Sequence, residues 1–264
     1  MSKKTLYGQA HTRVVTSKVG TVYVRGRSVT TKQAEALMRL RTLSEEDLIK
    51  EAARSPEHHW VLKDSEYCKV RIAVVRASAT YHTQLATDAD WAVRAAVAEA
   101  STKYHEQLLT DTHRAVRRAI ARASTKYHDL LVNDPYWTVR VAVAETSSTH
   151  HDVLKDDEDW VVRAAVARTS TKCHKQLKDD EDGVVRAAVA SASTKYHAQL
   201  VNDEHWLVRK EVAKTSNTYH EQLVGDADLR VRNAVAEAST MYHHILKDDE
   251  DLRVRNTVKN YKEE

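Results

Sequence analysis

The residues with the most reactive side chains in this sequence recur every 23 positions. An arginine column and a histidine column run through the chain in one register, without an insertion. Arginine binds phosphates and carboxylates through a planar fork of N–H donors, and histidine acts as a metal ligand or as a general acid or base. The first question is therefore whether these columns bind phosphate, bind metal or catalyse a reaction. The columns are Arg71, Arg94, Arg117, Arg140, Arg163, Arg186, Arg209, Arg232 and Arg255, and His82, His105, His128, His151, His174, His197, His220 and His243.

The spacing of the histidines argues against a metal site. Helices in adjacent repeats pack ~8–10 Å apart, whereas a zinc site needs several nitrogens within ~2.1 Å of one ion. The two cysteines, Cys68 and Cys173, are too few for a disulfide framework or a thiolate cluster. We therefore expect no metal and no cofactor, and interpret the imidazoles as caps of backbone groups in the turns between repeats, with neighbouring tyrosines packed beside them. A shared titration near pH ~6.5 is a second interpretation.

The arginine column is accompanied by acidic residues. From Arg94 onward, an aspartate stands six residues before each arginine, beginning with Asp88. Such an aspartate can pair with an arginine of its own or of the adjoining repeat, and regular alternation of charge is typical of a scaffold. We prefer this ladder to a phosphate-binding row, because the neighbouring acids would neutralise much of the positive field.

Catalysis has little support in the sequence. There is no G-x-S-x-G motif, no glycine-rich phosphate loop and no H-E-x-x-H motif. Every candidate acid, histidine or serine belongs to a column that recurs in many repeats, whereas catalysis normally needs one special constellation. The sequence therefore predicts a protein that is not an enzyme.

The apolar residues predict the elements that position these columns. In the repeat at 88–110, one helix face is predicted from the i, i+3, i+4, i+7 spacing. Asp88 or Asp90 would cap the start of this helix, and Ser101 and Thr102 would end it and begin a shorter one. Neither helix can bury its apolar face alone, so we predict that the repeats stack into an all-α solenoid. The predicted apolar face comprises Val93, Ala96, Val97 and Ala100.

The register divides the chain into two predicted domains. Residues 1–41 form an N-terminal module and residues 42–264 form the solenoid. Residues 42–64 are a degenerate leading repeat, residues 65–248 hold eight full repeats, and residues 249–264 are a partial terminal repeat. The full repeats are 65–87, 88–110, 111–133, 134–156, 157–179, 180–202, 203–225 and 226–248.

The repeat pattern D-x-x-x-x-V-R-x-A-V-A-x-x-S-x-x-x-H-x-x-L-x-x-D resembles HEAT-type repeats, and most closely the leucine-rich repeat variant family. The resemblance covers roughly residues 42–260 and implies that each repeat pairs an α-helix with a short 3₁₀-type helix. It implies no single function, because such solenoids serve many unrelated partners. The iron–sulfur cluster that precedes the repeats of the best-known variant has no ligands here, since no cysteine precedes Cys68. Some DNA glycosylases are built from HEAT-like repeats, so an enzymatic function is kept as an alternative.

The N-terminal module is strongly basic. Residues 1–43 carry nine lysines and arginines against one acid, Glu35, while residues 44–264 have a net charge of about −5. Residues 12–29 are rich in β-branched side chains and predict a β-hairpin, and Thr30 or Thr31 would cap a helix over about 32–41. This ββα module would cover the open end of the solenoid. Its charge also suggests nucleic-acid binding, together with a lysine column. The residues of this alternative are Arg25, Arg27, Lys32, Arg39, Lys103, Lys126, Lys172 and Lys195.

Two columns vary from repeat to repeat and therefore bear most on function. The first, three residues before each arginine, reads Cys68, Trp91, Arg114, Trp137, Trp160, Gly183, Trp206, Leu229 and Leu252. A core position would not accept glycine and arginine without a cavity or a buried charge, so we expect it to be exposed at the helix start. The second, one residue after each arginine, includes Arg118 and Lys210 and should lie on the same face. The alternative is that each tryptophan folds over its neighbour as part of the core.

The sequence thus favours a non-enzymatic binding scaffold that presents a variable aromatic row to a protein partner. Nucleic-acid binding is the alternative, and charge mimicry of DNA by acidic turns such as residues 155–159 ranks last. We expect a cytoplasmic protein without membrane contact, because no apolar stretch approaches ~18 residues and the N-terminus lacks a signal-peptide core. The predicted partner-binding residues are Trp91, Arg114, Trp137, Trp160, Trp206, Arg118 and Lys210.

Overall fold

The computed structural model describes residues 4–5, 13–16, 22–24 and 27–261. Its residues group into two compact units, an N-terminal unit (Met1–Ala123) and a C-terminal unit (Ser124–Glu264), and each is described by itself. None of the helices in this part of the chain has both the length and the apolar character needed to cross a lipid bilayer.

Four short strands precede the first helix. They are β1 (Lys4–Thr5), β2 (Arg13–Thr16), β3 (Val22–Val24) and β4 (Arg27–Val29), and they pair antiparallel in chain order. The β-hairpin predicted over 12–29 includes residues 12, 17–21 and 25–26, which lie outside the described residues, so it stays a prediction. Helix α1 (Thr31–Leu40) follows and begins with a capping box, in which Thr30 and Gln33 each bond the other's backbone N–H.

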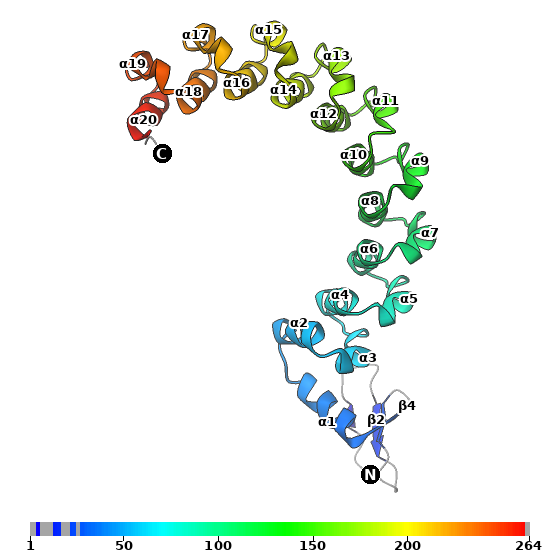
Figure 1. Cartoon of the computed structure of the whole chain (residues 1–264). Coiled ribbons are helices and arrows are strands. Elements are labelled where there is room, and N and C mark those ends of the chain that lie inside the picture. The colour runs from blue at the N-terminus through cyan, green and yellow to red at the C-terminus, as the bar shows by residue number, and fades with distance from the viewer. Residues whose placement is uncertain (1–3, 6–12, 17–21, 25–26, 262–264) are drawn as a thin grey trace. The chain divides into compact units, whose positions relative to one another are not determined.

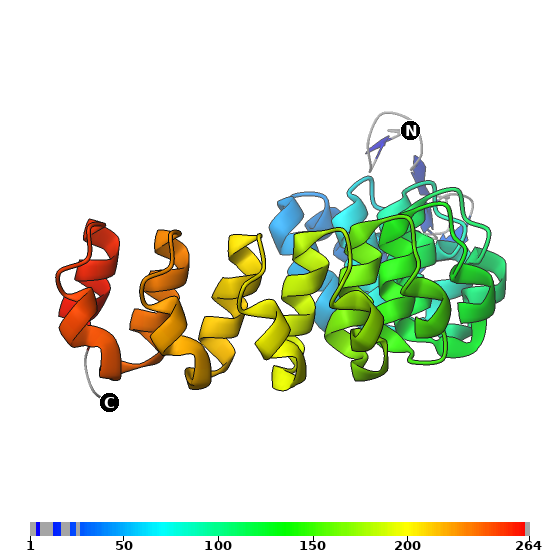
Figure 2. The same ribbon diagram turned by 90° about the horizontal axis from the view of Figure 1, so that it is seen from above.

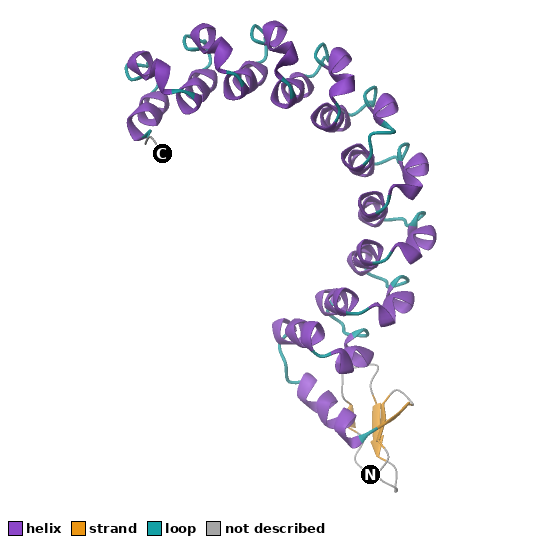
Figure 3. Cartoon of the chain, in the orientation of Figure 1, coloured by secondary structure: helices purple, strands orange, loops and turns teal. Residues whose placement is uncertain are grey.

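Most repeats contain a main helix of ten residues followed by a 3₁₀ turn and a four-residue α-helix (Figure 3), but in the repeat at 134–156 no 3₁₀ turn lies between the two helices. The N-terminal unit contains α2 (Glu45–Arg54), η1 (Pro56–His58), α3 (His59–Leu62), α4 (Cys68–Ala77), η2 (Ala79–Tyr81), α5 (His82–Leu85), α6 (Trp91–Ala100), η3 (Thr102–Tyr104), α7 (His105–Leu108) and α8 (Arg114–Ala123). The C-terminal unit contains η4 (Thr125–Tyr127), α9 (His128–Leu131), α10 (Trp137–Thr146), α11 (His151–Leu154), α12 (Trp160–Thr169), η5 (Thr171–Cys173), α13 (His174–Leu177), α14 (Gly183–Ala192), η6 (Thr194–Tyr196), α15 (His197–Leu200), α16 (Trp206–Thr215), η7 (Asn217–Tyr219), α17 (His220–Leu223), α18 (Leu229–Ala238), η8 (Thr240–Tyr242), α19 (His243–Leu246) and α20 (Leu252–Asn260).

The repeats of each unit stack in two layers. Main helices pack side by side in one layer, for example α4 on α6 and α12 on α14, and the short helices form the other (Figures 1 and 2). The valine columns are fully buried between the layers, as at Val93 and Val97, and the leucine column closes the core from the short helices. The predicted helical repeat architecture is therefore confirmed. Ala100 is exposed rather than buried, because the main helix also turns Ala95 and Ala98 toward its neighbours.

The column histidines cap the main helices. His151 Nε2 lies 2.8 Å from the carbonyl oxygen of Ala144, one of the last carbonyls of α10. The same bond, seven residues back, is made by His82, His105, His174, His197, His220 and His243. The predicted capping role is confirmed, but the bond lies within one repeat rather than between repeats. Tyrosine packing also differs from the prediction. Tyr104 lies edge-on to His82 of the preceding repeat, because stacking brings that ring closer than its sequence neighbour.

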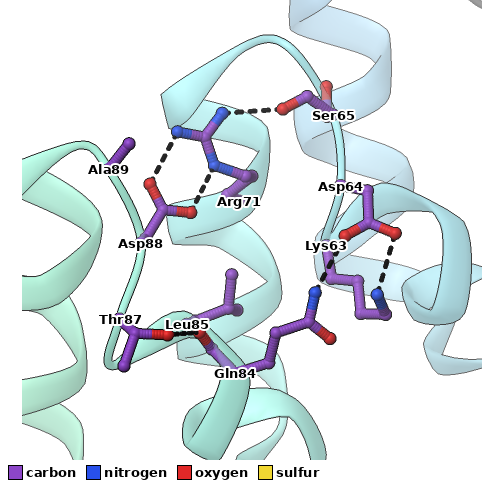
Figure 4. Close-up of a pocket in the computed structure, with 9 residues that line it drawn as sticks. All are labelled: Lys63, Asp64, Ser65, Arg71, Gln84, Leu85, Thr87, Asp88 and Ala89. Atoms are coloured by element: carbon purple, nitrogen blue, oxygen red, sulfur yellow. Dashed lines mark hydrogen bonds and ion pairs between the residues drawn. The ribbon is translucent and has the colours of Figure 1, made fainter. Parts of the chain in front are cut away.

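The column arginines tie adjacent repeats together. Arg71 donates from Nε and Nη2 to the carboxylate of Asp88, both at 2.8 Å, and from Nη1 to the carbonyl of Ser65 at 2.7 Å (Figure 4). Asp88 lies in the loop that begins the next repeat. The predicted arginine–aspartate ladder is therefore confirmed, and its ion pairs join adjoining repeats rather than residues of one repeat. The same bidentate bond joins Arg94 to Asp111, Arg140 to Asp157, Arg163 to Asp180, Arg186 to Asp203, Arg209 to Asp226 and Arg232 to Asp249.

Candidate functional site

Three tryptophans stand exposed at the first position of a main helix. Trp91 begins α6 and is 45% exposed, Trp137 begins α10 and is 43% exposed, and Trp160 begins α12 and is 42% exposed. The valine two residues later, such as Val139, turns into the core, which directs the first residue toward solvent. Burial in the core, the alternative for this column, therefore does not apply to these three rings.

Trp206, at the same position of α16, is half-buried beneath two cations. The guanidinium carbon of Arg230 lies 3.4 Å from the centre of the indole ring, and Lys210 Nζ lies 5.7 Å from it. Arg230 also donates from Nε and Nη2 to the carboxylate of Asp228, at 2.9 and 2.6 Å. This hydrogen-bonded partner lowers the pKa of Asp228 to about 2. Trp206 and Asp228 thus form a cation site that the chain fills with its own arginine.

A second column, missed in the sequence, shares this edge of the main helices. It is the residue just before each main helix, and in two repeats it lies against the first residue of the preceding main helix. The His113 ring stacks on Trp91 with centroids 4.2 Å apart and planes 16° apart, and a Cβ at Gly183 would lie 2.6 Å from Cγ of His205. The sequence could have indicated this column, because its residue type also varies from repeat to repeat. It reads Tyr67, Asp90, His113, Tyr136, Asp159, Asp182, His205, Asp228 and Asp251.

The second predicted row, one residue after each arginine, is only partly exposed. Its alanines Ala95, Ala164 and Ala187 are buried, which corrects the prediction of a surface position there. Its larger members, including Arg118 and Lys210, are half-buried or exposed. Arg114, the first residue of α8, is exposed. Whether any of these residues binds a partner stays a prediction.

The residues of the nucleic-acid alternative are not brought together with the tryptophans. The side chains of Arg25 and Arg27 lie outside the described residues, Lys32 is exposed, and Arg39 pairs with Glu51. The lysine column is exposed in the 3₁₀ turns of the short-helix layer, with Lys126 Nζ 4.9 Å from the centre of the Tyr127 ring. The further members of this column in the structure are Lys103, Lys172 and Lys195.

In the C-terminal unit, carboxylates lie in the loops that lead into the main helices. Each loop from Asp157 to Asp159 and from Asp180 to Asp182 holds three acids, of which the first is paired with a column arginine. The middle residue is almost fully exposed, with Glu158 at 88% and Glu181 at 87%. The loops therefore carry more negative charge than the ladder neutralises, beside the exposed rings of Trp137 and Trp160.

No protein-family model matches this chain, and no curated protein matches it. A solved structure described as "a leucine-rich repeat variant with a novel repetitive protein structural motif" is similar, with a TM-score of 0.58 and 26% sequence identity. The match covers 75% of this chain and 87% of that one. The expected resemblance to the leucine-rich repeat variant is therefore confirmed.

Proposed function

We propose that this helical repeat protein, similar in structure to the leucine-rich repeat variant, is a non-enzymatic scaffold that binds a protein partner through its tryptophan edge. We define the tryptophan edge as the first residues of the main helices together with the residues just before them. One observation carries the proposal. Trp137 and Trp160 occupy the same position on the packed helices α10 and α12, and each leaves more than two fifths of its surface exposed.

Closely spaced, exposed indole rings favour the binding of a partner protein. A tryptophan contributes a large apolar surface, and exposing it to water costs about 25 cal/mol per Å² of apolar area that could be buried. Interfaces concentrate their binding energy in such residues, each often worth ~2 kcal/mol or more. A rigid main helix holds each ring in place, so binding would order few additional groups.

The polar columns support a structural rather than a catalytic role. The column arginines are held by aspartates and carbonyls, as Arg163 is by Asp180 and Asp157. The column histidines use Nε2 to cap helices, as His174 does for Ala167. Groups committed to such bonds in repeat after repeat are unsuited to act as one catalytic constellation.

We also propose that residues 1–41 are a basic cap of the solenoid. Helix α1 buries Ala34, Leu37 and Leu40, and Arg39 pairs with Glu51 of α2 at 2.5 Å. Such contacts would cover the apolar face of the leading repeat, which would otherwise meet water.

Partner capture tests the scaffold proposal. Immobilised protein should retain partners from a host lysate, and Trp137→Ala/Trp160→Ala should lose them. Leu130→Ala/Val153→Ala is the matched control, because it removes two exposed apolar residues from the short-helix layer of the same unit. Equal capture by both double variants would contradict the proposal.

Nucleic-acid binding is the second candidate, and the exposed lysine column with its adjacent tyrosine rings favours it. Nuclease treatment of the lysate should remove capture only if this candidate is right. Replacing Arg25, Arg27, Lys32 and Arg39 with Gln should then flatten the salt dependence of DNA binding by ~0.9 per lost phosphate contact. Undiminished binding by that variant would move the site to the lysine column.

A further inference from the structure

The chain shows how its tryptophan edge binds an arginine. At Trp206, the guanidinium of Arg230 lies flat enough over the ring to bring its carbon within 3.4 Å of the centre, while the carboxylate of Asp228 holds two of its nitrogens. Asp228 is the residue just before α18, and it caps that helix by accepting the backbone N–H of Arg230. Indole face and carboxylate are therefore two walls of one guanidinium site.

Two further tryptophans have an aspartate at the position equivalent to Asp228 but no arginine at the position equivalent to Arg230. Trp137 is followed one repeat later by Asp159, and Trp160 by Asp182, which cap their helices as Asp228 does. The residue equivalent to Arg230 is a valine in both, Val161 and Val184.

The regular stacking of the repeats implies that each aspartate approaches the tryptophan of the preceding repeat. Main helices α10, α12 and α14 pack in succession as α16 and α18 do. The contacts of His113 with Trp91 and of His205 with Gly183 show the same approach in other repeats. Exposure agrees, because Trp206 is half-buried beneath its arginine whereas Trp137 and Trp160 are exposed.

The negative charge of the loops around these sites favours a cationic ligand. Glu158 and Glu181 extend into solvent from the same loops, and each makes only a longer contact to a column arginine, at 3.6 and 3.3 Å. A phosphate would meet repulsion here, and a basic segment would meet attraction. The N-cap aspartates also offset the positive end of each helix, which would otherwise repel a cation.

We propose that the Trp137–Asp159 and Trp160–Asp182 pairs each bind an arginine side chain of a basic partner segment. This inference rests on the proposed function and specifies the chemistry of the partner. Arginine fits better than lysine because its planar guanidinium stacks on a ring while it donates to a carboxylate. Adjacent helices lie ~8–10 Å apart. A polyproline II segment has three residues per turn and rises ~3.1 Å per residue, so arginines three residues apart lie on one side of it, ~9 Å from each other, and match the two sites.

A synthetic peptide provides the probe. A fluorescein-labelled peptide with arginine at every third position and alanine between should bind the full chain at low salt, measured by anisotropy. The same peptide with citrulline in place of arginine keeps the shape, loses the charge and should bind roughly tenfold or more weakly. Equal binding of the two peptides would overturn the proposal.

The internal site at Trp206 suggests variants that test the two proposed sites directly. Val161→Arg/Val184→Arg should fill both sites from within, as Arg230 fills its own, and weaken peptide binding by roughly tenfold. Leu130→Arg/Val153→Arg adds the same charge to the exposed short-helix layer and should weaken it far less. Similar losses in both variants would mean that general charge, not the two sites, controls binding.

Removing the internal arginine should have the opposite effect. Arg230→Val opens the Trp206–Asp228 site and should strengthen peptide binding. Arg253→Val is the matched control, because Arg253 occupies the same position in its repeat and lies 3.5 Å from Asp251, but the first residue of the preceding main helix is Leu229 rather than a tryptophan. Equal effects of the two variants would count against the proposal.

Failure of this inference can be told from failure of the proposed function. If Trp137→Ala/Trp160→Ala loses its captured partner while the arginine peptide does not bind the unmodified chain, the arginine chemistry is wrong and the scaffold role stands. If that variant keeps its partner, the scaffold role is wrong. Circular dichroism of each variant shows whether the helices are retained.

Discussion

His205 occupies the space that any side chain at Gly183 would need. A Cβ at Gly183 would lie 2.6 Å from Cγ and 2.8 Å from Cβ of His205, closer than atoms of this kind approach. The imidazole also caps α16, because its Nδ1 accepts the backbone N–H of Leu207. With His205 in this position, glycine interrupts the column between Trp160 and Trp206, whereas the His113 ring is placed so that it stacks on Trp91 in the equivalent pair.

This contact predicts a paired effect. Gly183→Ala should destabilise the chain by ~1–3 kcal/mol, the usual cost of overpacking, although alanine is the better helix former. Gly183→Ala/His205→Asp should recover most of the loss, since aspartate is the capping residue in other repeats. Gly225→Ala, where nothing lies within 4 Å of the added Cβ, is the control and should change stability little. Urea unfolding measures all three, and equal losses at the two glycines would refute the steric explanation.

The arginine ladder should be costly to break in the middle of the stack. Arg163 and Asp180 both have nearly buried side chains, so Arg163→Met should leave a buried carboxylate without its partner and cost ~3–5 kcal/mol. Lys214→Met removes the more exposed contact to Glu211 and should cost less than ~1 kcal/mol. Denaturant unfolding would contradict the prediction if the two variants were equally stable.

Stability should depend on pH through the same ladder. The hydrogen-bonded guanidinium of Arg232 lowers the pKa of Asp249 from its ordinary value of 3.8. A carboxylate with a lowered folded-state pKa contributes stability that is fully present above its unfolded value and is lost as the pH falls through the folded one. The chain should therefore lose stability below pH ~4, and Arg232→Met should lose less over the same range. Parallel pH profiles from urea titrations would contradict this assignment.

The position of a core defect along the stack should decide its effect. Val166 is fully buried in α12 within the C-terminal unit, whereas Val258 is half-buried in the last helix, α20. Each repeat is stabilised by its neighbours, so Val166→Asp should disrupt contacts on both sides while Val258→Asp frays one end. Circular dichroism should show the larger helix loss for Val166→Asp, and equal losses would be incompatible with stacked repeats.

The tryptophans of the edge should matter more for binding than for folding. Because Trp137 and Trp160 are more than two fifths exposed, their joint replacement by alanine should lower the melting temperature little. Truncation of a fully buried tryptophan costs ~3–5 kcal/mol. A thermal melt of the double variant measures the difference, and a large drop in the midpoint would mean that the rings support the core.

The secondary structure of the repeats could be predicted from the local pattern of apolar and capping residues. Apolar spacing predicted the main helix of each repeat, and Asp90 caps α6 as one of the two aspartates proposed for that role. The variation of the column that contains Gly183 and Arg114 also indicated a surface position. The burial of Ala95 and Ala164 was missed, because one helix alone does not show how closely its neighbours approach from both sides.

By itself, the sequence determined the repeat length and the helical stack, because each depends on side-chain periodicity within one repeat. Only the tertiary structure decided which residues meet across repeats. Stacking brings His113 onto Trp91, Arg230 onto Trp206 and the carboxylate of Asp88 to Arg71, although each pair is about one repeat apart in sequence. Such contacts depend on the distance and rotation between adjacent helices, which the spacing of residues along one chain does not specify.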